Sequence, residues 1–268
     1  MRFVDVAGAQ VSYKVDGSGP GLLLVSGTGG TLESNWAHLV DGFARHRTVV
    51  RADYSGSGDT LDQHEQLSVE LLAEQIVAAA RAADAAPFDL VGFSLGACVS
   101  VHIAAHYPEL VRSLVLLGGF VSGDDARLQL QSRLWLDLIR SDPRTFARLV
   151  LLTGFSPEFL SGLSGAQIDE WIEGILSMNK WDGIARQIEL DRTLDISEQA
   201  KRIKTPTLVI GCSHDNMVPV RHSRALASMI PDARYAELPS GHLAPFELPD
   251  EFSTLVMDFI SGAGDARS

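Results

Sequence analysis

The sequence predicts an α/β fold in which a mostly parallel, eight-stranded sheet carries helices on both faces. Short, fully apolar runs such as residues 22–25 and 114–117 are typical of strands buried on both faces. Segments with apolar residues at helical spacing, such as residues 67–83, separate these runs. The 268 residues, with 46% hydrophobic and 21% charged side chains, suit one large globular domain with an insertion.

The amino-terminal part predicts a hairpin followed by regular alternation of strands and helices. Residues 3–7 and 11–15 alternate apolar with polar side chains, which favours an antiparallel pair with one face in water. The expected order then continues with a strand at 22–25, a helix at 36–44, a strand from 48, a helix at 67–83, a strand at 88–91, a helix at 98–106 and a strand at 113–117.

The alternation stops between residues 122 and 204, where the sequence shows no convincing strand. We therefore predict a core domain of residues 1–121 and 205–268, interrupted after the sixth strand by a helical cap of residues 122–204. The cap shows helical patterns at 126–139, 144–152, 167–178 and 181–190, and the core resumes with a strand at 207–211, a helix at 222–229, a strand at 234–238 and a helix at 251–260.

The net charge and the hydropathy of the chain exclude some classes of binding partner. A formal net charge of -12 argues against nucleic acid and anionic membranes, which bind clustered Lys and Arg. No run approaches the roughly 20 apolar residues that a membrane span needs. Cys98 and Cys212 are expected to be buried thiols in a reducing compartment rather than a disulfide. We expect a cytoplasmic protein, either a monomer or a homodimer.

The segment Gly92-Phe93-Ser94-Leu95-Gly96 has the pattern G-x-S-x-G at a strand-to-helix corner. This pattern indicates a nucleophile elbow, in which a strained backbone makes the serine hydroxyl project from the sheet. The glycines two residues to either side remove the Cβ atoms that would clash. Ser94 could instead be an ordinary turn serine, but its position between a predicted strand and a predicted helix favours the nucleophile elbow.

A serine nucleophile needs a base, and the base needs a residue that orients it. Asp215 follows the strand at 207–211, and His242 follows the strand at 234–238, so both lie where parallel strands build sites. Asp215 could instead cap a helix, in which case Asp124 or Asp125 would replace it. Among the other histidines, His64 and His214 are candidates for a contact with the substrate, because they lie in loops.

The chain resembles the small, single-domain members of the α/β-hydrolase fold family that carry a cap between core strands six and seven. The matching motifs are G-F-S-L-G at 92–96, P-T-L-V-I-G…D…V-P at 206–219 and G-H…E-x-P at 241–249, together with a glycine loop at 53–58. The resemblance implies that Ser94 is the nucleophile, that His242 acts as base and then acid, and that Asp215 orients the imidazole.

The loop after the third strand departs from the family pattern, because Ser26-Gly27 stands where His-Gly is usual. The resemblance implies that the backbone N–H groups of Thr28 and Leu95 form the oxyanion hole. A backbone donor does not depend on the lost histidine side chain. Since each such donor is typically worth about 3 kcal/mol of the barrier, the geometry of this loop matters to the rate.

A serine nucleophile with two N–H donors indicates acyl chemistry without a metal or organic cofactor. We expect a carboxylic-ester or lactone hydrolase that cleaves a small hydrophobic acyl substrate through an acyl-enzyme. The alternatives are a biosynthetic thioesterase, cyclase or acyl transferase that takes an acyl-carrier thioester, a C–C bond hydrolase, and a receptor that binds without turnover. Beyond the loop residues Gly27 and Gly29, the expected substrate pocket is apolar and contains Phe120, Trp135, Phe155, Trp181 and Leu243.

Overall fold

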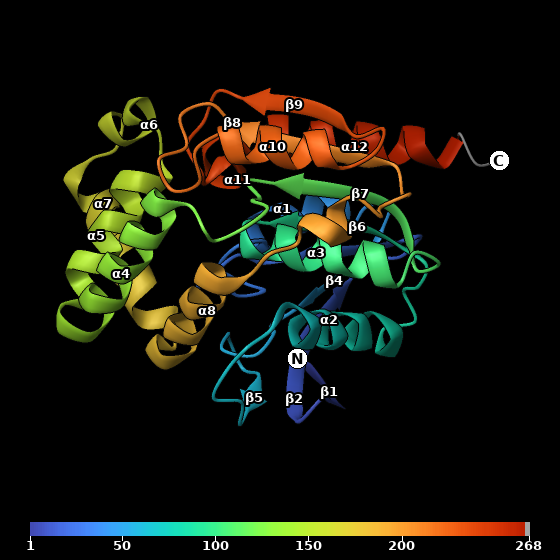
Figure 1. Ribbon diagram of the computed structural model, residues 1–268, viewed down its shortest axis with the longest axis horizontal. Coiled ribbons are helices and arrows are strands. Elements are labelled where there is room, and N and C mark those ends of the chain that lie inside the picture. Colours follow the sequence, from blue (N-terminus) through green and yellow to red (C-terminus); the bar gives the residue numbers. More distant parts are fainter. Residues whose placement is uncertain (266–268) are drawn as a thin grey trace.

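The computed structural model describes residues 1–265 and shows one twisted sheet with helices packed on both sides (Figure 1). Eight strands follow the spatial order β1-β2-β4-β3-β6-β7-β8-β9, and the two-residue strand β5 adds to β2. The first two strands pair antiparallel to their neighbours, and every pair from β4 to β9 is parallel. The strands are β1 Arg2–Val6, β2 Ala9–Asp16, β3 Gly21–Val25, β4 Thr48–Ala52, β5 Leu61–Asp62, β6 Phe88–Phe93, β7 Val111–Leu117, β8 Thr207–Cys212 and β9 Arg234–Leu238.

The prediction of an α/β fold with a mostly parallel sheet is therefore confirmed. Helix α3 begins directly after Ser94, three residues earlier than predicted, and three short helices, α6, α9 and α11, were not predicted. The helices are α1 Ala37–Phe43, α2 Val69–Ala82, α3 Leu95–His106, α4 Ala126–Ser141, α5 Pro143–Gly154, α6 Pro157–Ser161, α7 Gly165–Met178, α8 Trp181–Thr193, α9 Ser197–Ala200, α10 Arg221–Met229, α11 Ala244–Glu247 and α12 Pro249–Asp265.

The strands in the middle of the sheet are buried on both faces, as their largely apolar sequences predict. In β3, Leu23 and Val25 pack toward a core cluster that includes residues of α2 and α3. Leu22 and Leu24 point the other way, into a cluster with residues of α1 and α12. Two hydrophobic layers thus hold the sheet rigid, so that loops at its carboxyl edge start from fixed points.

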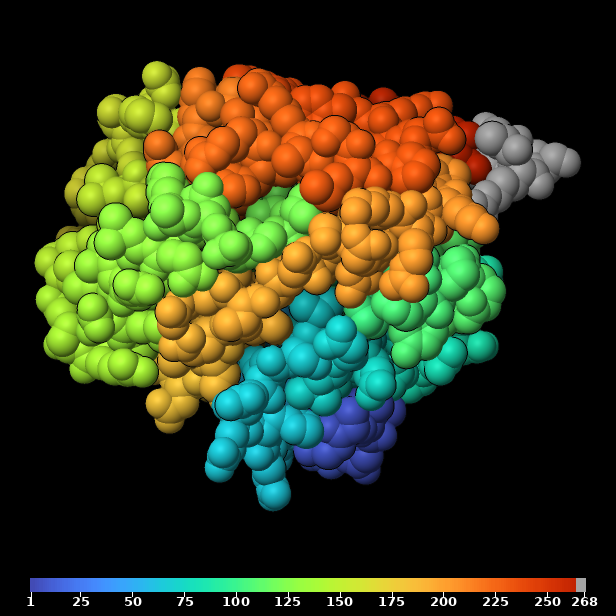
Figure 2. Space-filling view, in the orientation of Figure 1, coloured from blue at the N-terminus to red at the C-terminus, as the bar shows by residue number. Residues whose placement is uncertain are grey.

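Helices α4 to α9 lie between β7 and β8 in the chain, in the segment for which we predicted a cap. Figure 1 shows α4 to α8 gathered beyond one end of the sheet. On the face seen in Figure 2, residues of α8 separate the green α4 region from the cyan residues that follow β4. Arg186 of α8 binds Asp62 of β5 with Nη1–Oδ1 2.5 Å, which joins these two regions. Through residue 265, no helix is long and apolar enough to cross a membrane.

Candidate active site

Ser94 lies at the corner between β6 and α3 with a φ of 56° and a ψ of −120°. A positive φ is strained for a residue with a side chain, and such strain is a feature of functional corners. The corner is tightly packed, because a Cβ on Gly92 would lie 2.4 Å from the carbonyl oxygen of Gly96. The side chain of Ser94 lines a cavity between the core and α4 to α8.

His242 and Asp215 meet behind this serine. The Nδ1 of His242 lies 2.6 Å from Oδ2 of Asp215, and both residues are buried. The other carboxylate oxygen of Asp215, Oδ1, accepts the N–H groups of Met217 and Val218 at 2.8 Å each. The carboxylate is therefore held from two sides, and it fixes the ring of His242 with Nδ1 turned away from the cavity.

The loop that carries His242 is fastened to the end of α5. Oε2 of Glu247 accepts the N–H groups of Gly241 and Ser156, each at 3.0 Å. The N–H of Leu243 donates to the carbonyl of Gly154 at 2.9 Å. Glu247 is the glutamate of the motif G-H…E-x-P, so this motif ties the loop of the histidine to the helical segment.

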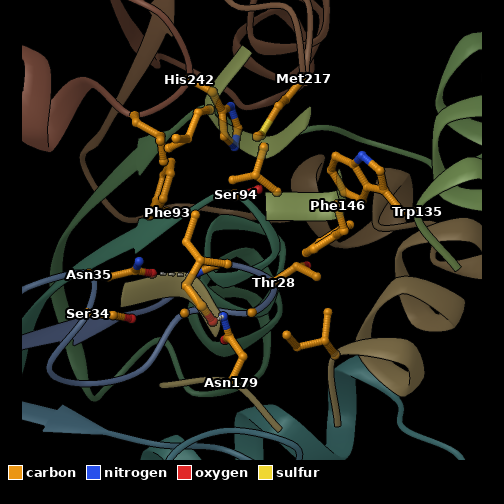
Figure 3. A pocket seen from close by; sticks show the side chains of 18 of the residues that line it. Thr28, Ser34, Asn35, Phe93, Ser94, Trp135, Phe146, Asn179, Met217 and His242 are labelled. Atoms are coloured by element: carbon orange, nitrogen blue, oxygen red, sulfur yellow. Dashed lines mark hydrogen bonds between the residues drawn. The ribbon is translucent and has the colours of Figure 1, made fainter. Parts of the chain in front are cut away.

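The structure brings Ser94 and His242 into the wall of one cavity, where Figure 3 shows them beside each other. Among the described residues, no hydrogen bond joins the Ser94 hydroxyl to the imidazole. The rival groups lie elsewhere. Asp125 caps α4 and pairs with Arg221 at 3.0 Å, and Asp124 is exposed. His64 and His214 are not part of the cavity wall.

The loop after β3 runs directly past Ser94. A Cβ added to Gly27 would lie 2.9 Å from Cβ of Ser94, so only glycine permits this close approach. The neighbouring N–H groups are engaged: that of Gly27 donates to Oδ1 of Asn35 at 3.0 Å, and that of Gly30 to the carbonyl of Gly27 at 2.9 Å. The hydrogen bonds of the described residues include none from the N–H groups of Thr28 and Leu95, the two predicted oxyanion donors.

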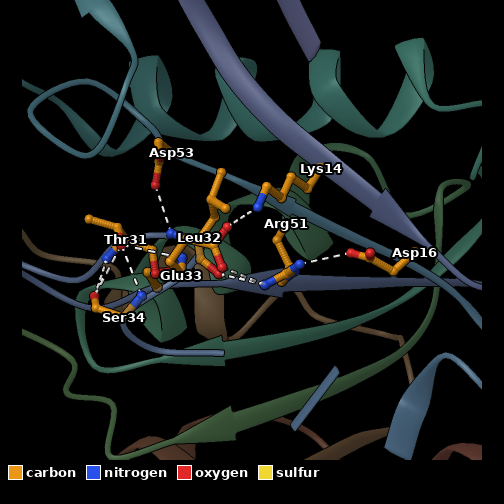
Figure 4. Close-up of polar contacts among 9 residues, drawn as sticks. Lys14, Asp16, Thr31, Leu32, Glu33, Ser34, Arg51 and Asp53 are labelled. Carbon is orange, nitrogen blue, oxygen red and sulfur yellow. Dashed lines mark hydrogen bonds and ion pairs between the residues drawn. The ribbon is translucent and has the colours of Figure 1, made fainter. Parts of the chain in front are cut away.

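Polar contacts hold this loop from behind (Figure 4). The Tyr54 hydroxyl donates to the carbonyls of Ser26 and Gly27 at 2.8 and 3.1 Å. Arg51 donates to the carbonyl of Leu32 at 2.9 Å, and Oδ1 of Asp53 accepts the N–H of Leu32 at 2.7 Å. Burial raises the pKa of Asp53, since water is excluded around its carboxyl.

Ser26, which replaces the usual histidine, takes part in the same support. Its hydroxyl donates to the carbonyl of Thr31 at 3.1 Å and closes the loop on itself. The loop is thus not left slack by the substitution, because Ser26 and Tyr54 fix its start and Arg51 fixes its end.

Helix α8 holds the loop from the cavity side. Oε1 of Gln187 accepts the N–H of Gly29 at 2.9 Å, and Nε2 of the same buried side chain donates to Oγ of Ser57 at 2.9 Å. One turn later, Oδ2 of Asp191 accepts the hydroxyl of Thr28 at 2.6 Å. The sequence did not single out either residue, and their spacing indicates only that they lie on the same face of one helix.

Replacing Gln187 by leucine is expected to lower kcat by about 10- to 100-fold, with a smaller change in KM. The change leaves the N–H of Gly29 without its acceptor, so the adjacent N–H of Thr28 loses its fixed position. Steady-state kinetics with an aryl acetate measure this effect. Gln129→Leu is the matched control, because Gln129 also bonds backbone carbonyls, those of Gly123 and Arg192, but touches no part of the loop. An equal loss in both variants would contradict a specific role for the loop.

The cavity has a volume of about 540 Å³ and lies between Ser94 and His242 on one side and the helices α4, α5, α7 and α8 on the other. Figure 3 shows Trp135 and Phe146 on the side away from Phe93, and Thr28, Asn35 and Asn179 below Ser94. Apolar residues from these elements form much of the wall, whereas the end near the loop is polar. The apolar wall includes Phe120, Trp135, Phe146, Val150, Leu151, Ile184, Met217 and Leu243.

Of the predicted pocket residues, Gly27, Gly29, Phe120, Trp135 and Leu243 line this cavity. Phe155 and Trp181 do not. Phe155 is fully buried and packs against Phe159 and Trp171, with ring centroids 4.6 and 5.2 Å away. Trp181 stands edge-on to Phe146 at 6.0 Å. These two rings stabilise the contacts between helices, so aromatic content alone did not separate lining from packing.

The two cysteines do not line the cavity. Cys98 and Cys212 are free and buried, and burial raises the pKa of both thiols far above its usual range. Among residues 1–265, no three His, Cys, Asp or Glu side chains lie together so as to hold a metal ion.

Residues 20–249 match the model of the α/β-hydrolase fold, and the chain therefore belongs to that family. It is similar to the pyrrolizixenacetamide deacetylase of Xenorhabdus hominickii, with 53% identity over 97% of this chain and 98% of the relative. Among solved structures it is similar to a hydrolase from Pseudomonas aeruginosa PA01, with 26% identity, a TM-score of 0.86 and 97% coverage of both chains. The enol-lactonase of Burkholderia xenovorans LB400 shares the fold, with a TM-score of 0.87 at 24% identity over 97% of this chain and 100% of the other. The chain is a hydrolase that acts on ester-type bonds, as the sequence predicted.

Proposed function

We propose that this enzyme hydrolyses the acetamide of a small hydrophobic amine through an acyl-enzyme on Ser94. The site that supports the proposal is the strained Ser94 in one cavity with His242, whose Nδ1 is held by Asp215 at 2.6 Å. The name of the relative at 53% identity describes removal of an acetyl group from an acetamide. Because of this similarity, we expect the enzyme to cleave an amide bond in place of the carboxylic ester that the sequence favoured.

In the proposed reaction, Nε2 of His242 takes the proton of the Ser94 hydroxyl as the oxygen attacks the amide carbonyl. The negative charge that develops on the carbonyl oxygen is accepted by the N–H groups of Thr28 and Leu95. His242 then gives its proton to the departing nitrogen, and the C–N bond breaks to leave acetyl-Ser94 and a free amine. Water, deprotonated by His242, attacks the acetyl ester and releases acetate.

The shape and polarity of the cavity support a compact substrate. A volume of about 540 Å³ is that of an ordinary small-molecule site, and the rings of Phe120, Trp135 and Phe146 favour an apolar amine. The backbone of the loop comes close to Ser94 at Gly27, where an added Cβ would lie 2.9 Å from Cβ of Ser94, so the loop bounds the cavity beside the serine. A short acyl group such as acetyl suits that side of the cavity.

The direct test is hydrolysis of p-nitroacetanilide, compared with p-nitrophenyl acetate, a short acyl-thioester and a lactone. We expect turnover of the anilide, with acetate and p-nitroaniline released in equal amounts, and an acetyl adduct on Ser94 in acid-quenched samples examined by mass spectrometry. Turnover of the thioester or the lactone with none of the anilide would overturn the proposal in favour of the alternatives that the sequence leaves open.

A further inference from the structure

Asp191 is the one carboxyl group of α8 that forms part of the cavity wall together with Ser94 and His242 in the described part of the chain. Its Oδ2 accepts the Thr28 hydroxyl at 2.6 Å, while Oδ1 is shielded from solvent and has no partner among the described residues. No Lys or Arg of the described residues pairs with it. Burial raises the pKa of this carboxyl to about 7, and the nearby His242 partly offsets this rise.

Support of the loop accounts for Oδ2 of Asp191 but not for Oδ1. Gln187, which lies one turn earlier, already holds the loop through the N–H of Gly29, and its Nε2 bonds Ser55 and Ser57 after β4. A carboxyl group has about four lone-pair positions, and the Thr28 hydroxyl fills one of them. Leaving a buried acceptor without a donor is destabilising, and a catalytic or binding role is one of the reasons for which a protein keeps such a group.

The bond to Thr28 places Asp191 beside the loop after β3. The N–H of Thr28 is the proposed donor to the carbonyl oxygen of the substrate, and the side chain of the same residue bonds Asp191. The charge of His242 is also near enough to lower the pKa of Asp191. Asp191, Ser94 and His242 line one cavity, so the carboxyl lies beside the space that the reacting amide would occupy.

We propose that Asp191 accepts a hydrogen bond from the N–H of the scissile amide and so selects amides over the corresponding esters. This inference rests on the proposed function. A secondary amide brings the donor that the carboxyl lacks, whereas the alkoxy oxygen of an ester has no hydrogen and faces the carboxyl with its own lone pairs. The same contact steadies the nitrogen while it receives its second hydrogen from His242.

The test compares p-nitroacetanilide with p-nitrophenyl acetate in the wild type and in Asp191→Leu, which removes every acceptor at similar size. We expect the ratio of kcat/KM for the amide to that for the ester to fall by about 30-fold or more. Effects on Ser94, His242 or the loop alter both substrates and cancel in this ratio. Asp191→Asn, which keeps an oxygen for Thr28, replaces the leucine variant if that one does not fold, and a fall in the same direction is expected.

A change in the substrate gives the same information without a change in the protein. N-methyl-p-nitroacetanilide lacks the N–H, so methylation is expected to lower kcat/KM far more in the wild type than in Asp191→Asn. An unchanged amide-to-ester ratio in the variants, or equal effects of methylation in both proteins, would overturn the role of Asp191 and leave acetamide hydrolysis intact. A wild type that cleaves the ester but no acetamide would instead overturn the proposed function and, with it, this inference.

Discussion

Replacing Ser94 by alanine is expected to lower kcat for acetamide hydrolysis by about a million-fold, to below the detection limit of ordinary assays. The loss is this large because the bond-forming oxygen is removed, and water cannot take the same position without the constraint of the elbow. Substrate binding is expected to change little, because the proposed donors, the N–H groups of Thr28 and Leu95, remain in this variant. Steady-state kinetics and equilibrium binding of the anilide measure the two effects separately.

Ser100→Ala provides the matched control for this variant. Ser100 lies on the same helix, is buried, and its hydroxyl has no partner among the described residues. We expect near wild-type rates in this control and a full acetyl adduct in acid-quenched samples. An acetyl adduct that persists in Ser94→Ala would assign the nucleophile to another residue.

Replacing Asp215 by asparagine is expected to lower kcat by about 10⁴-fold while the fold is retained. Oδ1 of Asp215 accepts two backbone N–H groups, so the amide oxygen of asparagine has to take that side. The NH₂ group then faces Nδ1 of His242, which is forced to become an acceptor. The ring proton moves to Nε2, and that nitrogen can no longer take the proton of Ser94.

The measurement is kcat at saturating substrate, together with the thermal midpoint of unfolding. Asp124→Asn is the matched control, because Asp124 is the exposed carboxylate that the sequence left as a substitute acid. It is expected to leave kcat unchanged. A loss of less than about tenfold in Asp215→Asn would mean that the tautomer of His242 is set by some other group.

The strands and the sites at their ends could be predicted because their signals are local. The apolar runs of β3 and of residues 114–117 in β7, and the corner around Ser94, each depend on a few adjacent residues. The order Ser94, Asp215, His242 follows from which strand each residue ends. The two residues that end the last two strands meet in the structure, where Nδ1 of His242 lies 2.6 Å from Oδ2 of Asp215.

The contribution of α8 could not be predicted in the same way. The predicted helix ended at residue 190, one short of Asp191, and nothing near that residue indicates which surface it meets. Gln187 and Asp191 acquire their partners only when the segment folds back on the loop after β3. For the same reason, the sequence could not distinguish Trp135, which faces the cavity, from Trp181, which packs against Phe146.

Helix α8 is hydrogen-bonded to Gly29 and Thr28. Movement of this helix away from the cavity would therefore also remove the support of the loop after β3. If the helix lifts to admit an amine or to let it leave, it takes with it the partners that keep the oxyanion donors in position. Under the proposed mechanism, a molecule with this helix lifted would be a poor catalyst, because Thr28 and Gly29 would lose the bonds that hold them. The acetyl ester on Ser94 would then form and be hydrolysed only while α8 is bound to the loop, so the helix would take part in each catalytic cycle.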